Sequence, residues 1–171
     1  VDAVVSGINP GYNTSRNVFI SGTMGAAIQA SSKGVKACAF SLGLGGDIND
    51  SVAGVITGAI TKELLSAETA RGALFNVNFP NIDGNEYSGA EGAAPATSEF
   101  VSKLEAQSDG GFELFSGLRV NVEGLELTPG TDLEVINRDR ISISSLEGPT
   151  LTHQPSDPTL HRMIDAANRV I

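Results

Sequence analysis

The 171-residue sequence has few basic side chains and no long apolar run. Eleven lysines and arginines stand against twenty acidic residues, which gives a formal net charge of −9. A chain of this charge would repel a long polyanion, so we expect no nucleic acid polymer as a partner. No apolar stretch approaches the roughly 20 residues that span a bilayer, and no basic segment followed by an apolar one opens the chain. We therefore expect no membrane partner and no export signal within this sequence.

Cysteine is almost absent as well. The single cysteine, Cys38, can form no internal disulfide, and its place within an apolar segment is typical of a small core residue. A reducing compartment fits this usage, and we expect a cytoplasmic protein. The chain begins with Val1 in place of methionine, and an apolar run starts at Ala3. This abrupt start indicates a piece of a longer protein. The hydrophobic content of the 171-residue sequence, 40%, predicts one domain over 1–171.

Apolar runs alternate with helical periodicity in the first half of the chain. The runs bounded by glycine or proline cover 3–5, 35–42 and 73–79. Continuous runs of this length are typical of strands buried on both faces. Apolar residues recur at helical spacing between 21 and 34 and again over 51–65. This order predicts an α/β fold over 1–80, with a partial, Rossmann-like and mostly parallel sheet flanked by helices.

The second half of the chain has a different character. From 81 to 99 glycine, alanine, serine and acidic residues dominate, which favours a long loop or mobile arm outside the core. Shorter strands are predicted at 112–122, 133–136 and 141–146. We group the arm and these strands as a β-rich appendage over 81–150. A C-terminal helix within 151–171 follows, because Asp157 and Pro158 provide an N-cap and a first-turn proline before an apolar stripe.

The loop between the first strand and the first helix, residues 6–23, is the most informative stretch. In an open parallel sheet, ligands bind beyond the carboxyl ends of the strands, where this loop must lie. The N–H groups of Gly22, Thr23 and Met24 would be unpaired donors at the helix start, at the positive end of its dipole. Ser21 and Thr23 add hydroxyl groups, and Gly22 lets a phosphate approach the backbone closely. The pattern predicts an anion site.

Two asparagines of the same loop add neutral donor groups. Asn9 and Asn13 are suited to complete the shell of a hard cation or to hold a phosphate oxygen. The alternative is an ordinary helix start, since serine is a common N-cap and asparagine and glycine are common turn residues. Arg16 either clamps a phosphate by bidentate pairing or is a solvated loop arginine. We interpret His153 and His161, which lack ligand spacing, as surface residues.

Several sequence blocks are shared with a known family. The loop block consists of 1–9 with Gly11, Asn13, 21–23, Ala26 and Ala27. The later blocks are 37–42, 75–80, 130–132 and 141–146, in the same order along the chain. Together they resemble the SurE family, the stationary-phase survival proteins that act as metal-dependent 5′/3′-nucleotidases. The likeness covers most of the chain.

The resemblance implies that the intact protein hydrolyses nucleoside monophosphates with a divalent metal ion, Mg²⁺ or Mn²⁺. It implies Asn9 as a metal ligand and, with Thr23, as a catalytic residue. It further implies that Asn13, Ser21, Gly22 and Thr23 surround the substrate phosphate. The family's other metal ligands are two adjacent aspartates and a serine of an amino-terminal part, so we expect this chain alone to be inactive. A homodimer or homotetramer is expected, and the alternative function is a non-catalytic module that binds phosphate or nucleotide.

Overall fold

A six-stranded mixed sheet forms the centre of the fold. The computed structural model describes residues 1–44, 50–68, 70–82, 87–97, 103–106, 111–115, 127–147 and 152–171. The strands of the sheet are β1 (Ala3–Pro10), β2 (Lys36–Leu42), β3 (Leu74–Phe79), β4 (Ala90–Gly92), β7 (Ile141–Glu147) and β8 (Thr152–His153). Their order is β1-β2-β3-β7-β4, with β8 also paired to β7. β1, β2 and β3 are parallel, β7 is antiparallel to β3, and β4 is parallel to β7.

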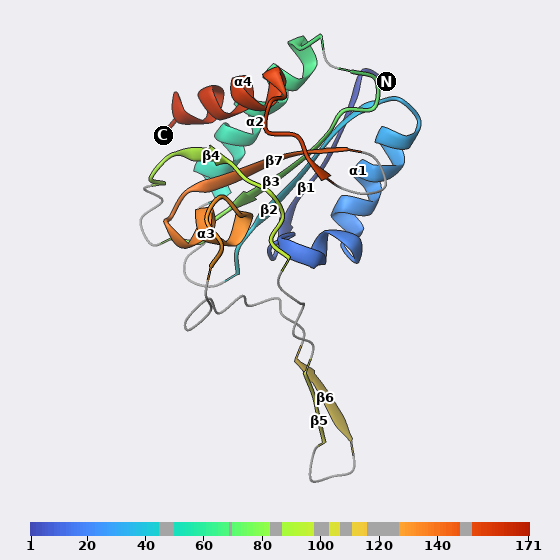
Figure 1. Cartoon of the computed structure of the whole chain (residues 1–171), viewed down its shortest axis with the longest axis vertical. Coiled ribbons are helices and arrows are strands. Elements are labelled where there is room, and N and C mark those ends of the chain that lie inside the picture. The colour runs from blue at the N-terminus through green and yellow to red at the C-terminus, as the bar shows by residue number, and fades with distance from the viewer. Residues whose placement is uncertain are drawn as a thin grey trace.

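Helices cover both faces of this sheet (Figure 1). α1 (Gly22–Ser32) contacts the three parallel strands on one face, whereas α2 (Asp50–Ser66) and α4 (Pro158–Asn168) pack against each other on the other face. A 3₁₀ helix, η1 (Ser15–Phe19), precedes α1, and the short α3 (Asp132–Asn137) lies beside β3 and β7. The predicted α/β fold is confirmed. None of the helices in the described part of the chain has the length and apolar character needed to cross a bilayer.

The two faces of the sheet bury different side chains because residues along a strand alternate in direction. Under α2 and α4 the core is aromatic: Phe40 and Phe79 are fully buried, with ring centroids 6.4 Å apart. Each such phenylalanine contributes roughly 1.5–3 kcal/mol to folding. Under α1 the core is built from small residues, where Ala37 and Ala39 pack with Met24. This small-residue face lets α1 lie close to the sheet.

The C-terminal helix begins as predicted. The Asp157 carboxylate caps α4 by accepting a hydrogen bond from the Thr159 N–H at 2.8 Å, and Pro158 occupies the first turn. Leu160 and Met163 are buried against the sheet. An N-cap of this kind contributes about 1 kcal/mol. The apolar stripe of α4 is therefore covered within the chain itself.

The prediction of an arm outside the core is wrong for the part of 81–99 that the structure describes. Tyr87, Ala90 and Ala93 are buried, and Ala90 begins strand β4 of the main sheet. The small residues serve close packing: a Cβ on Gly92 would lie 3.3 Å from the Ile164 side chain of α4. Small side chains thus mark a close strand-to-helix contact here. Residues 83–86 and 98–99 lie outside the described part.

The segment 133–136 is a helix, which corrects the predicted strand. Leu133 and Ile136 are buried at the three-residue spacing of a helix, and Thr131 precedes α3 with extended backbone. The strand at 141–146 is confirmed as β7 but belongs to the main sheet. Among the described residues, the appendage is thereby reduced to β5 (Lys103–Ala106) and β6 (Phe112–Phe115), an antiparallel pair that stands apart from the sheet in Figure 1. Residues 116–122 of the predicted strand lie outside the described part.

Candidate functional site

A buried polar stripe runs across the sheet on the face that α1 covers. Its members are Ser41, Asn76, Asn78, Ser142 and Ser144, all buried. Ser41 lies opposite Asn78 on the neighbouring strand, and Asn78 lies opposite Ser142. Asn76 is opposite Ser144 in the same register. Because buried polar groups need hydrogen-bond partners, we expect a polar segment to cover this stripe on the same face of the sheet.

The loop between β1 and α1 supplies that segment through Asn13. The Asn13 N–H donates to Asn78 Oδ1 at 2.8 Å, and its carbonyl accepts from Asn76 Nδ2 at 2.7 Å. The Asn13 side-chain Nδ2 donates to Ser41 Oγ at 2.5 Å. Asn13 is only 4% exposed. It anchors the loop on β2 and β3, and contact between Asn13 and a phosphate stays a prediction.

Tyr12 gives the loop a second anchor on the same strands. Its hydroxyl accepts a hydrogen bond from the Asn81 N–H at 3.0 Å, and burial raises the pKa of this phenol above its usual value. The neighbouring Gly11 N–H donates to the Leu42 carbonyl at 2.7 Å. Gly43 is required beneath the tyrosine, because a Cβ there would overlap the Tyr12 side chain. The loop path is thus determined by the ends of β2 and β3.

Asp132 is a third anchor, on α3. Its carboxylate accepts hydrogen bonds from the N–H groups of Ser15 at 2.8 Å, Ala96 at 2.9 Å and Leu133 at 2.8 Å. The residue is fully buried, and burial raises the pKa of the carboxyl to about 6, against the lowering effect of these backbone donors. Asp132 was not predicted as a site residue, since its sequence position showed only that it belongs to one of the family blocks.

The start of α1 differs from its prediction at one donor. The Ser21 hydroxyl oxygen accepts a hydrogen bond from the Met24 N–H at 3.1 Å, so the expectation that Met24 N–H is unpaired is wrong. The physical reason is that Ser21 is the N-cap itself. No described residue accepts a hydrogen bond from the N–H of Gly22 or Thr23. Gly22 is exposed, and a Cβ there would meet nothing within 4 Å.

Asn9 lies near the carboxyl end of β1, opposite Ser41 of β2. Its Nδ2 donates to the Gly11 carbonyl at 2.9 Å, and no described residue donates a hydrogen bond to its Oδ1. Asn9 and Asn13 therefore both lie beside Ser41. Asn9 is its partner in the strand register, and Asn13 donates a hydrogen bond to its hydroxyl. Figure 1 shows η1 and the start of α1 at this same end of the sheet. The predicted residues share one edge of the fold.

The donor set at this edge fits only part of a metal shell. Among the described residues, no three histidine, cysteine, aspartate or glutamate side chains are grouped to hold a metal ion. The Asn9 Oδ1 is one neutral oxygen, whereas Mg²⁺ binds six ligands, usually with one or two carboxylates among them. A divalent cation would thus need acidic ligands from outside the described residues.

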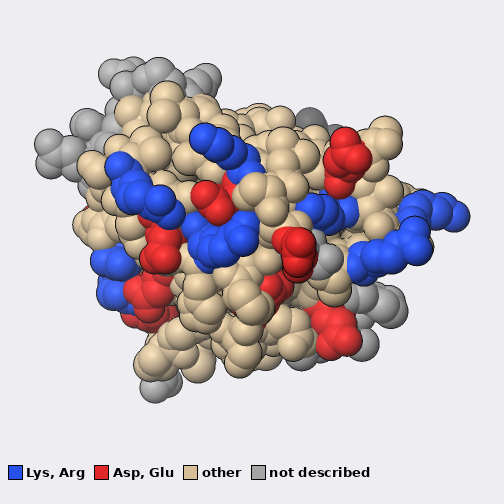
Figure 2. Space-filling model, turned by 90° about the horizontal axis from the view of Figure 1, so that it is seen from above, with Lys and Arg blue, Asp and Glu red and all other residues tan. Residues whose placement is uncertain are grey.

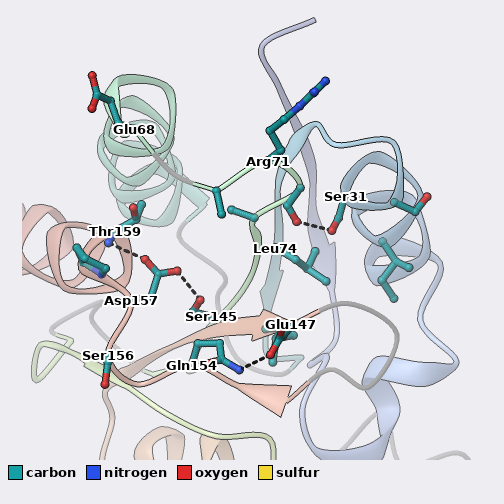
Figure 3. A pocket seen from close by; sticks show the side chains of 17 residues that line it. Ser31, Glu68, Arg71, Leu74, Ser145, Glu147, Gln154, Ser156, Asp157 and Thr159 are labelled. Carbon is teal, nitrogen blue, oxygen red and sulfur yellow. Dashed lines mark hydrogen bonds between the residues drawn. The ribbon is translucent and has the colours of Figure 1, made fainter.

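A cavity of about 860 Å³ opens at the opposite edge of the sheet, near the start of β3 (Figure 3). Several of its polar side chains have partners within the fold. The Asp157 carboxylate accepts from Ser145 Oγ at 2.7 Å, and Gln154 donates to Glu147 at 3.0 Å. These pairs hold α4 and β8 against β7. The cavity is remote from the loop residues.

Charge and histidine placement at this opposite edge also give no sign of chemistry. Seen from above, basic and acidic side chains are interspersed over the face, with no large area of one sign (Figure 2). His153 is half-buried, its Nδ1 lies 3.2 Å from the Ser145 carbonyl oxygen, and burial lowers its pKa. His161 is exposed on α4, as predicted, whereas the prediction of a surface residue holds only in part for the half-buried His153. At the loop edge, Arg16 of η1 is exposed. Neither histidine lies at the loop between β1 and α1.

Sequence comparison identifies the family. The family model described as Survival protein SurE matches residues 1–102. This chain belongs to the SurE family. The 5′-nucleotidase SurE of Methylorubrum populi is 32% identical over 150 residues, covering 85% of this chain and 59% of the relative. The 5′-nucleotidase SurE of Flavobacterium johnsoniae is 39% identical over 106 residues, covering 61% of this chain and 40% of the relative.

A solved SurE structure has the same fold. The SurE protein from Aquifex aeolicus superimposes with a TM-score of 0.69 at 23% sequence identity, covering 85% of this chain and 59% of that chain. The resemblance to the SurE family and the α/β fold are thus both confirmed. The chain spans about 59% of the length of the Methylorubrum relative.

Proposed function

We propose that the intact SurE protein carrying this chain is a metal-dependent phosphomonoester hydrolase that acts on nucleoside monophosphates. Family membership and the 5′-nucleotidase names of its relatives support this proposal. The observation that carries it is the loop geometry: Asn9 and Asn13 both meet Ser41 at the carboxyl edge of the parallel strands. Ligand sites of open parallel sheets lie at this edge.

The phosphate is proposed to bind at the start of α1. The N–H groups of Gly22 and Thr23 point from the positive end of the helix dipole, and the Thr23 hydroxyl adds a donor. The Ser21 oxygen already accepts from Met24 N–H, so its hydroxyl hydrogen is available to an anion. Asn13 contributes the loop anchor and the second hydrogen of its amide. This assignment keeps all four predicted phosphate residues.

The metal ion is proposed to bind beside Asn9. Its Oδ1 would be one ligand, and the acidic ligands would come from a part of the intact protein outside this chain. A bound Mg²⁺ or Mn²⁺ would neutralise charge on the phosphoryl group and lower the pKa of a water molecule. The chain alone, with a single neutral ligand, is therefore proposed to be inactive.

The test is hydrolysis of nucleoside monophosphates by the intact protein with Mg²⁺ or Mn²⁺. Asn9→Ala and Thr23→Ala are each expected to lower kcat/KM by about a hundredfold, the effect of losing one transition-state contact. Gln29→Ala is the matched control, since Gln29 is an exposed residue of the same helix as Thr23. Unchanged rates in Asn9→Ala and Thr23→Ala would remove both residues from the mechanism.

A non-catalytic binding module is the second candidate. The lack of an acidic metal cluster among the described residues favours it. The two candidates differ in metal dependence, so calorimetric titration of the protein with inorganic phosphate, with and without chelator, separates them. Binding that is unaffected by the chelator, together with no hydrolysis, supports the module.

Assembly and location complete the proposal. We propose a homodimer or homotetramer in the cytoplasm. Sedimentation equilibrium of the intact protein measures the mass of the assembly, and a monomer at micromolar concentration would contradict this part.

A further inference from the structure

Asp132 joins three separate segments through one buried carboxylate. Among the described residues, its Oδ1 accepts from Ala96 N–H and from Leu133 N–H, and its Oδ2 accepts from Ser15 N–H. The groups that face it are backbone donors, and none of these three can titrate. Burial of an unpaired charge is unfavourable, and three charge-assisted hydrogen bonds offset part of that cost. Such a group persists where its geometry is needed.

The Ser15 end of this contact has an unusual backbone. Ser15 has φ of 52°, the left-handed region that residues other than glycine seldom adopt. It is the first residue of η1, which leads directly to Ser21 and the start of α1. The Asp132 hydrogen bond holds the N–H of this residue in place. The direction in which η1 leaves the loop is therefore tied to α3.

We propose that Asp132 is a positioning residue of the phosphate site, holding Ser15 so that Ser21 to Thr23 lie in correct relation to Asn9. This inference rests on the proposed function. The anchors on β2 and β3 hold the loop at Tyr12 and Asn13, before Ser15. The Asp132 contact follows these anchors along the chain, between the metal side and the phosphate side of the loop. The Asp132 carboxylate contacts backbone N–H groups and not the substrate, so Asp132 acts on the phosphate site through the position of the loop.

Asp132→Asn separates this role from the other contacts of the residue. The Asn oxygen can keep the two hydrogen bonds from Ala96 and Leu133, but its NH₂ group then faces the Ser15 N–H, donor against donor. Glu134→Gln is the matched control. Glu134 lies on the same helix, pairs with Arg138 on the surface, and loses the same charge without touching the loop.

The first readout is amide hydrogen exchange of the 171-residue chain. In Asp132→Asn the Ser15 amide is expected to exchange at least about tenfold faster, while the amides of Ala96 and Leu133 stay protected. Glu134→Gln should leave all three unchanged. Unaltered exchange at Ser15 in Asp132→Asn would overturn the proposal.

The second readout is steady-state kinetics of the intact protein with a nucleoside monophosphate and Mg²⁺. Asp132→Asn is expected to lower kcat/KM roughly tenfold to a hundredfold, and Glu134→Gln to match the wild type. Equal kinetics of Asp132→Asn and wild type would overturn the positioning role even if exchange changed. If the wild type hydrolyses no nucleoside monophosphate, the proposed function fails first, and the exchange data alone then show whether the anchor exists.

A measurement on the wild type covers the case in which Asp132→Asn does not fold. Protonation of Asp132 places a hydrogen on its carboxyl, so the Ser15 amide resonance should shift with a midpoint near pH 6. Glu134→Gln should show the same titration. A Ser15 resonance that does not change between pH 5 and 7 would contradict the contact.

Discussion

Asn13 donates a hydrogen bond to Ser41 across 28 residues of sequence, from side-chain Nδ2 to Oγ at 2.5 Å. The bond ties the loop that follows β1 to the carboxyl end of β2. It is buried, and Ser41 in turn lies opposite Asn9 and Asn78 on the two neighbouring strands. One small hydroxyl thus sits among three asparagines that the loop and the sheet contribute.

Removal of this hydroxyl should be costly. Ser41→Ala leaves the Asn13 amide buried without that acceptor, which is expected to lower the free energy of unfolding by about 1–3 kcal/mol. Urea denaturation monitored by circular dichroism measures the change. Ser32→Ala is the control, because the Ser32 hydroxyl bonds only the carbonyl of Gln29 at the surface. Equal losses in the two variants would show that the Ser41 contact has no special weight.

Gly43 and Gly54 should respond to alanine in opposite directions. A Cβ on Gly43 overlaps the Tyr12 side chain, so Gly43→Ala is expected to destabilise the protein by about 1–3 kcal/mol. Gly54 lies within α2, where an added Cβ would meet nothing within 4 Å, so Gly54→Ala should stabilise by about 0.5–1 kcal/mol. Thermal melts of both variants test this. A neutral Gly43→Ala would mean that Tyr12 can move without cost.

The buried carboxyl of Asp132 should make stability depend on pH. Its folded pKa of about 6 lies above the ordinary aspartate value of 3.8, so the folded state binds the proton more tightly than the unfolded state. The protonated Asp132 therefore adds to the free energy of unfolding. This addition is complete below about pH 4 and is lost as the pH rises to about 6. Relative to Asp132→Asn, the wild type should lose roughly 3 kcal/mol across this window. Denaturant midpoints that differ by a constant amount from pH 4 to 7 would contradict this.

The single thiol should be inert in the folded protein. Cys38 is fully buried on β2, and burial raises the pKa of its thiol. The thiolate is the reactive form, so a thiol reagent at pH 8 should label the native chain far more slowly than the chain in urea. Mass spectrometry measures the extent of labelling. Equal labelling rates in the two conditions would place Cys38 at an accessible position.

The sheet core was predictable because its signals are local. The runs at 35–42 and 73–79 and the periodic helix between them carry their assignment in neighbouring residues. The run at 133–136 does not, since its three apolar residues, Leu133, Val135 and Ile136, fit a strand or one turn of helix equally well. The prediction of an arm over 81–99 was wrong for a similar reason, because glycine and alanine occur both in loops and under closely packed helices.

The candidate site was predictable only in part. The strand-to-helix loop has a distinctive sequence, which made Asn9 and Ser21 candidates. Asn76 and Asn78 alternate with Phe75, Val77 and Phe79, and this two-residue period was a usable sign of a polar face beneath the loop. Asp132 gave no such sign. Its partners Ser15 and Ala96 are 117 and 36 residues away, so only the folded chain reveals them.

The polar stripe beneath the loop between β1 and α1 couples the stability of this loop to that of the sheet interior. Loops of this size commonly open by themselves, far below the energy needed to unfold a domain. Here the Asn13 amide is bound by Asn78 of a fully buried strand. Its exchange with solvent should therefore need the same global opening as the β3 amides, so that this loop cannot open at Asn13 while the rest of the protein remains folded.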